Sequence, residues 1–184
     1  MQKIYEIAEN EEIYIAYKNL QHEVGNIQGL YTVHPRAGPV IVLDKSLLNN
    51  TKEHRCVAAH ELGHHFYPPR SAIAGIVSFH RGNFSGQREI TINQDENKAL
   101  RWATELLMPS AEVWDAIKGG CNTLPQLAER FHVEEWFVRF KIGFIRREER
   151  NRGRKLRWKD IICKKATTDP QARPRPKAKA HSYE

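Results

Sequence analysis

The segment "AAHELGHHFYPP", residues 58–69, constrains the fold more than any other part of the chain. His60 and His64 are four residues apart, so on a helix they share one face and their imidazoles can bind one metal ion. Glu61 lies about 100° round the helix from His60, which is where a base for a metal-bound water belongs. Two prolines then end the helix, because a residue before proline is pushed out of the helical region. The segment predicts a catalytic zinc helix that needs a third protein ligand from elsewhere.

Glu96 is the predicted third ligand. The pattern is helical from Asp95 to Met108, and on that helix the apolar residues gather within about 60° of Glu96, at Ala99, Leu100, Ala103 and Leu107. A carboxylate on such an inward face must be paired, hydrogen-bonded or bound to metal. An alternative is that Glu96 is a carboxylate near a helix amino terminus, favoured there by the helix dipole.

Four other residues near the motif carry expectations. Gly63 costs about 1 kcal/mol relative to alanine inside a helix, which is understandable if the backbone approaches another element or a substrate closely. His80 could polarise a carbonyl or donate to an oxyanion, and Tyr67 is a second candidate for assisting catalysis, although surface positions are the simpler reading for both. Cys56 is expected to pack below the metal as a small buried hydrophobe.

The remaining patterns predict an α+β fold with a small amino-terminal sheet. Asn50 is expected to cap the zinc helix, which runs to about Phe66, and Glu53 to complete a capping box. An irregular loop over residues 70–94 is predicted to end in an edge strand, "REITIN". The other expected elements are a helix over 2–10, strands over 13–20, 26–33 and 39–44, and helices over about 95–108, 110–118, 124–131 and 134–146.

The net charge of +7 is confined to one end of the chain. Residues 1–144 hold 15 Lys and Arg against 17 Asp and Glu, whereas residues 145–184 hold 14 against 5. A basic tail attracts polyanions without sequence preference, so it predicts a non-specific contact with DNA or with an acidic protein surface. Alternating Pro, Lys, Arg and Ala at its end predict disorder.

Composition also bounds the compartment. No apolar run approaches the roughly 18 residues that a membrane span needs, and the charged amino terminus lacks the apolar core of a signal peptide. Three cysteines, far apart and odd in number, favour reduced thiols over a disulfide framework. These features predict a cytoplasmic protein that does not contact a membrane.

The stretch "LPQLAERFHVEEWFVRFKIGF" has the Ala-x-x-Phe-x-Val spacing of a helix-turn-helix core. Glu134 and Glu135 open the would-be recognition helix, where DNA phosphates would repel them. Trp136, Phe137 and Phe140 follow where polar residues that read bases are expected. A helical subdomain that packs on the rest of the protein, and grips a substrate, is therefore favoured over DNA binding.

With these residues identified, the chain resembles the ImmA/IrrE family of metallo-endopeptidases, found in bacteria and their mobile elements. The resemblance covers about residues 1–145. It is carried by "GLYTVHPRAGPVIVLD", "AAHELGHHF" and "ENKALRWATELLMP" and continues into "LPQLAERFHVEEWFVRFKI". The family pattern Glu-x-x-Ala-x-x-aromatic-Ala-x-x-Leu-Leu-Met-Pro is met at every position, by Glu96, Ala99, Trp102, Ala103, Leu106, Leu107, Met108 and Pro109.

The resemblance implies that His60, His64 and Glu96 bind Zn²⁺ and that Glu61 is the catalytic glutamate. It implies a zincin-like peptidase domain over residues 1–112, a helix-turn-helix-like helical subdomain over 113–146 and a basic, partly disordered tail over 147–184. The sequence departs from the family at Leu100, where many members carry an Asn or Asp that can orient a metal-bound histidine.

The activity implied is cleavage of a transcriptional repressor of the helix-turn-helix type, often encoded nearby. Such cleavage relieves repression of a prophage, another mobile element or a stress response. Two alternatives remain at this stage. The chain could be a DNA-binding regulator whose metal site is structural, or its peptidase site could be masked until a signal or partner opens it.

Overall fold

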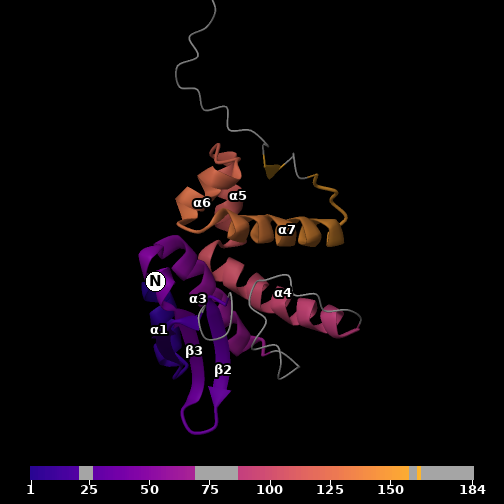
Figure 1. Cartoon of the computed structure of the whole chain (residues 1–184). Coiled ribbons are helices and arrows are strands. Elements are labelled where there is room, and N and C mark those ends of the chain that lie inside the picture. Colours follow the sequence, from indigo (N-terminus) through magenta and orange to yellow (C-terminus); the bar gives the residue numbers. More distant parts are fainter. Residues whose placement is uncertain (21–26, 69–86, 158–160, 163–184) are drawn as a thin grey trace, which may run out of the picture.

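A computed structural model describes residues 1–20, 27–68, 87–157 and 161–162, with side chains described from residue 94 onward in the third of these stretches. A three-stranded sheet and helix α1 occupy one end, and helices α5, α6 and α7 occupy the other (Figure 1). Helices α3 and α4 lie between the two ends. The α+β fold class expected from the sequence is confirmed.

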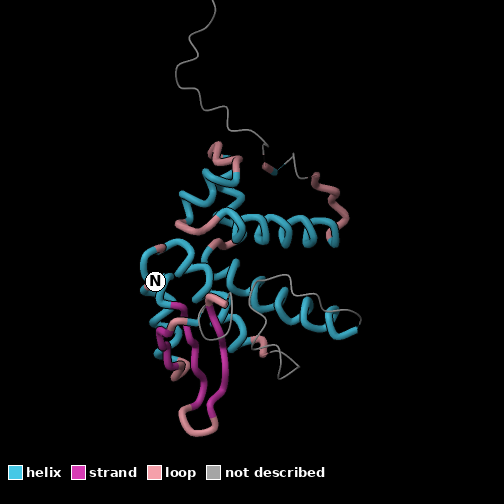
Figure 2. Tube along the Cα trace, viewed as in Figure 1, coloured by secondary structure: helices cyan, strands magenta, loops and turns pink. Residues whose placement is uncertain are grey.

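The sheet has the strand order β1-β3-β2, with β1 at Tyr14–Lys18, β2 at Gly29–His34 and β3 at Gly38–Asp44 (Figure 2). Strand β1 runs parallel to the central strand β3, and β2 pairs with β3 as an antiparallel hairpin. The side chains of β3 alternate, because Ile41 and Leu43 are fully buried while Val40 and Val42 are half-buried. Strand β2 is left with one unpaired edge among the described residues.

Helix α1, Gln2–Asn10, and helix α3, Thr51–Phe66, both contact the sheet side of the core, and α3 also packs against α4, Gln87–Leu107. A short 3-10 helix, η1 at Lys45–Asn49, leads from β3 into α3. Every residue of α3 from Cys56 to His64 is buried, whichever way it faces. The helix is therefore enclosed by the sheet on one side and by α4 on another.

The start of α3 differs in part from the expectation. Asn50 caps the helix as predicted, accepting a hydrogen bond from the backbone N–H of Glu53 at 3.2 Å. The predicted capping box does not form, because the Asn50 N–H donates to the carbonyl of Leu47 at 3.0 Å. The Glu53 carboxylate instead accepts the indole N–H of Trp136 at 2.8 Å. A contact from a distant helix replaces the local one.

The expected edge strand "REITIN", residues 88–93, is wrong, because these residues belong to α4. Isoleucine and threonine favour strands only weakly, and context overrides that preference. No glycine or proline interrupts the chain between Gln87 and Leu107, so the helix predicted from Asp95 continues eight residues further toward its amino terminus. The rest of the predicted loop, residues 70–86, lies outside the described residues, as does the end of the tail.

The helical end consists of α5 at Ser110–Lys118, α6 at Leu124–Phe131 and α7 at Glu135–Asn151. Thr123 and Gln126 form a complete capping box at the start of α6. Helix α7 runs five residues beyond its predicted end and lies along α4 (Figure 1). The predicted domain boundaries at 112 and 146 fall within α5 and α7, and the division into three parts stays a prediction.

The turn between α6 and α7 is attached to the first half of α3. The Arg55 guanidinium donates to the carbonyls of Phe131 and His132, at 3.0 and 2.8 Å. Cys56 is fully buried and its thiol accepts the backbone N–H of Glu134 at 3.3 Å. Burial raises the pKa of this thiol, so it stays protonated. Cys56 therefore packs as the expected buried hydrophobe and also helps to dock the helical end onto α3.

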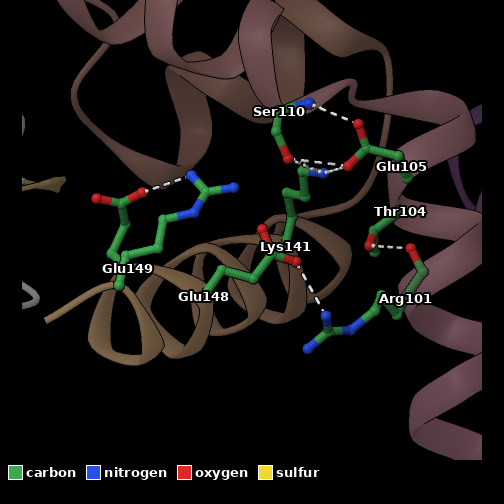
Figure 3. Close-up of polar contacts among 8 residues, drawn as sticks. Arg101, Thr104, Glu105, Ser110, Lys141, Glu148 and Glu149 are labelled. Carbon is green, nitrogen blue, oxygen red and sulfur yellow. Dashed lines mark hydrogen bonds and ion pairs between the residues drawn. The ribbon is translucent and has the colours of Figure 1, made fainter. Parts of the chain in front are cut away.

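A buried lysine joins α4, α5 and α7 (Figure 3). The side chain of Lys141 is 3% exposed, and its ammonium donates to the Glu105 carboxylate and, at 2.9 Å, to the Ser110 hydroxyl. Glu105 also accepts the Ser110 backbone N–H at 3.0 Å. Burial raises the pKa of Glu105, but the hydrogen bonds from Lys141 and Ser110 outweigh burial and lower it overall. The pair is therefore charged, and it ties the end of α4 to α7.

Replacing Glu105 with glutamine is expected to lower the free energy of unfolding by about 1–3 kcal/mol, because the buried Lys141 ammonium loses its counter-charge. Lys141→Met removes the buried ammonium itself, so no buried charge is left for Glu105 to neutralise. The free energy of unfolding is expected to change by less than about 1 kcal/mol. Urea titrations of the two variants measure the difference. Equal destabilisation by the two variants would contradict the view that the unpaired Lys141 ammonium is what destabilises Glu105→Gln.

Among the described helices, none has the length and apolar character that a membrane crossing requires.

Candidate metal centre and active site

The three predicted ligands converge. His60 Nε2 lies 3.1 Å from Glu96 Oε2, His64 Nε2 lies 3.4 Å from Glu96 Oε1, and the two Nε2 atoms are 3.3 Å apart. Atoms bound to a tetrahedral zinc at 2.0–2.1 Å are about 3.3 Å from one another. The observed separations therefore match the edges of a metal coordination polyhedron, and this donor set could hold a metal ion.

The cluster is enclosed and charged. The side chains of His60 and His64 are 3% and 7% exposed, and that of Glu96 is 20% exposed. Burial raises the pKa of Glu96, but the hydrogen bonds from the two imidazoles outweigh burial and lower the pKa to about 2. The carboxylate is therefore ionised at neutral pH, the form that binds a metal. A buried anion beside two imidazole nitrogens fits a divalent cation.

Gly63 permits the close approach of the two ligand helices. A Cβ atom added to Gly63 would lie 2.4 Å from the backbone carbonyl oxygen of Ala99 on α4, a distance that no side chain tolerates. The expectation that another backbone approaches this glycine is confirmed. Because Gly63 lies between His60 and His64 in sequence, and Ala99 lies one turn after Glu96, the same crossing places the carboxylate beside the imidazoles.

Glu61 faces the sheet, whereas His60 and His64 face α4. Glu61 is 4% exposed, and burial raises its pKa, although the neighbouring histidines act in the opposite direction. The backbone N–H of Tyr31 donates to its carboxylate. A Cβ atom added to Gly29 would lie 2.7 Å from Glu61 Cγ and Oε1. Glu61 therefore occupies space that a glycine on β2 leaves open.

The strand register explains why the backbone N–H of Tyr31 is available to the Glu61 carboxylate. The N–H of Asp44 donates to the carbonyl of Gln28, so this opposed pair is a hydrogen-bonded one. Hydrogen-bonded and non-hydrogen-bonded pairs alternate along an antiparallel ladder, and Tyr31 opposes Ile41 three positions further along. The Tyr31 N–H therefore points away from β3, at the open edge of the sheet.

The other expectations have mixed outcomes. Tyr67 is 44% exposed directly beyond the end of α3, and His80 lies outside the described residues, so a part for either in catalysis stays a prediction. Leu100 is 3% exposed and apolar, so it cannot orient a metal-bound histidine. His64 Nδ1 is correspondingly buried without a hydrogen-bond partner among the described residues.

Two residues at the site, Gly29 and Tyr31, were missed in the sequence. A glycine inside a strand indicates a bulge or a close backbone approach, and that signal could have identified Gly29. Tyr31 acts through its backbone N–H, which every non-proline residue has, so its part at the site needed the strand pairing to be known.

The family model described as the IrrE N-terminal-like domain, Peptidase_M78, matches residues 8–142, more than half of the chain. The chain belongs to the M78 peptidase family. Comparison with curated proteins gave no match. An M78 peptidase is a metallopeptidase, so the chain hydrolyses peptide bonds, requires a metal ion and acts on a protein substrate.

Proposed function

We propose that this M78 peptidase is a zinc-dependent endopeptidase in which His60, His64 and Glu96 bind the ion and Glu61 transfers protons. The observation that carries the proposal is the convergence of two imidazoles and one carboxylate at coordination distances, with a second carboxylate on the same helix as the imidazoles. Zinc bound there would lower the pKa of its water to about 7 and polarise the scissile carbonyl.

In the proposed reaction, Glu61 is the residue that transfers protons. Its carboxylate takes a proton from the attacking water and delivers it to the nitrogen of the leaving amine. Burial raises the pKa of Glu61 and so makes the carboxylate a stronger base than an exposed one. The Tyr31 N–H holds the Glu61 carboxylate in place. The enclosing helices exclude bulk water from the site.

The open edge of β2 supports a peptide substrate bound in extended form. Thr32, Val33 and His34 are exposed at the end of this strand, and an added strand can pair with an unpaired edge. An extended peptide there would run past Glu61, which lies against the same edge at Gly29. Such pairing would hold the substrate through main-chain hydrogen bonds.

The substrate we propose is a transcriptional repressor of the helix-turn-helix type, encoded near this chain and cut at one or a few bonds in the cytoplasm. This part of the proposal rests on the resemblance to the ImmA/IrrE family. The alternative of DNA reading through α7 is disfavoured, because Phe137 and Val138 of this helix are fully buried and Trp136 is bonded to α3. Contact of the basic tail with DNA or with an acidic repressor surface remains a prediction.

Incubating the zinc-loaded protein with the purified repressor tests the proposal. We expect discrete fragments, their loss when a chelator removes the metal, and their return when zinc is added back. Mass spectrometry of the fragments identifies the bond. A repressor that stays intact with a fully zinc-loaded protein would reject this substrate, and cleavage that persists after complete removal of metal would reject the metal mechanism.

A further inference from the structure

Glu61 and His65, one helical turn apart on α3, both contact Tyr31 of β2. The carboxylate of Glu61 accepts the backbone N–H of Tyr31, and His65 Nδ1 is 3.1 Å from the Tyr31 hydroxyl oxygen. The two rings pack edge to face, with centroids 5.8 Å apart. On the far side of the imidazole, His65 Nε2 lies 3.4 Å from a carboxylate oxygen of Glu11, in the turn after α1.

We propose that Tyr31 and His65 are positioning residues, which hold the open edge of β2 against α3 so that the Tyr31 N–H fixes the carboxylate of Glu61. The inference rests on the proposed part of Glu61 in proton transfer. Neither Tyr31 nor His65 touches the reacting atoms, and both act through Glu61.

The strand needs such a tie because, in the part of the chain that the structure describes, β2 is paired on one side only, with β3. From Thr32 onward β2 is exposed, and its turn into β3 passes through Gly38, which has a left-handed φ of 75°. Gly29 has no side chain with which to hold the strand against Glu61. The part-buried hydrogen bond between the Tyr31 hydroxyl and the His65 imidazole is a direct side-chain tie from β2 to α3 beside the base. Misplacement of a reacting group by about 1 Å can cost about 100-fold in rate.

The chain contains a matched tie that lacks this consequence. Tyr17 of β1 lies 2.9 Å from Nε2 of His54 on the same helix α3, and the two rings pack edge to face with centroids 5.6 Å apart. Both ties join the sheet to α3 through a tyrosine and a histidine. Only Tyr31 also donates its backbone N–H to Glu61, so loss of the Tyr17 hydroxyl should leave the base in place.

Amide hydrogen exchange tests the proposal on the zinc-loaded full-length protein by nuclear magnetic resonance. In Tyr31→Phe and in His65→Leu we expect exchange at residue 31 to accelerate about fivefold to tenfold, with little further change in the double variant, because both remove one bond. Tyr17→Phe should leave exchange at residue 31 unchanged. The Leu30 N–H is the internal reference, since Leu30 opposes Val42 in a hydrogen-bonded pair.

Repressor cleavage supplies the second readout. Tyr31→Phe and His65→Leu should lower kcat about tenfold to 100-fold with less than about twofold change in KM and with full zinc occupancy, whereas Tyr17→Phe should keep the parent kcat. Unchanged exchange at residue 31, or equal acceleration at residues 30 and 31, would overturn the positioning proposal. If the parent protein cleaves no repressor, the proposed function fails, and the exchange data still decide whether the tie holds the strand.

Discussion

Replacing Glu61 with glutamine is expected to abolish measurable repressor cleavage, with a fall in kcat of about 10²- to 10⁴-fold, while the zinc content stays at one ion per chain. Glutamine has nearly the same shape as glutamate, so it can still accept the Tyr31 N–H and fill the space beside Gly29. It cannot take a proton from water. Cleavage kinetics, together with metal analysis of the purified variant, separate loss of the base from loss of the ion.

Glu112→Gln is the matched control for this change. Glu112 lies exposed on α5, so the same loss of one carboxylate there should leave kcat and zinc content unaltered. If the Glu61→Gln variant cleaved the repressor at the parent rate, Glu61 could not be the proton-transferring group. If the variant lost zinc as well as activity, the substitution would have disturbed the ligands. The loss of activity would then be due to the missing ion and not to the missing base.

The second large effect is expected at Gly63. Gly63→Ala should lower the free energy of unfolding by about 1–3 kcal/mol, because the new methyl group would lie 2.4 Å from the Ala99 carbonyl oxygen and α4 must move away. The movement separates Glu96 from the two histidines, so zinc affinity should fall about tenfold or more. Urea unfolding of the metal-free protein and competition for zinc with a coloured chelator measure the two effects.

Gly143→Ala provides the control, since Gly143 lies inside α7 and an added Cβ there meets nothing within 4 Å. Alanine is the better helix former, so this variant should gain about 1 kcal/mol of stability with no change in zinc affinity. A Gly63→Ala variant that behaved like Gly143→Ala would show that the two ligand helices do not cross as closely as the structure places them.

The clustering of His60, His64 and Glu96 was predictable from the sequence because its signals are local. His60 and His64 share a helix face through their spacing alone, and Glu96 stands out because the apolar residues of its helix surround it. Both inferences use only helical periodicity. The structure brings the three side chains together, as expected.

Features that depend on distant partners were not predictable in this way. Glu53 has the spacing of a capping box, yet its carboxylate accepts a hydrogen bond from Trp136, 83 positions away in the sequence. The tie between Tyr31 and His65, and the N–H that Tyr31 offers to Glu61, depend on strand register and on which sheet edge is open. The start of α4 was misjudged for a different reason, because isoleucines and threonine outweighed the absence of any helix-breaking residue.

The contacts between α3 and α4 share one offset. His60 meets Glu96, Gly63 meets Ala99, and Phe66 stacks on Trp102 with ring centroids 4.6 Å apart, each pair being 36 positions apart. The His60–Glu96 contact, the close backbone approach at Gly63 and the aromatic stack therefore constrain the same sliding movement of α3 along α4. A length change in the chain between the helices alters all three offsets by the same amount and leaves the matching of side chains intact.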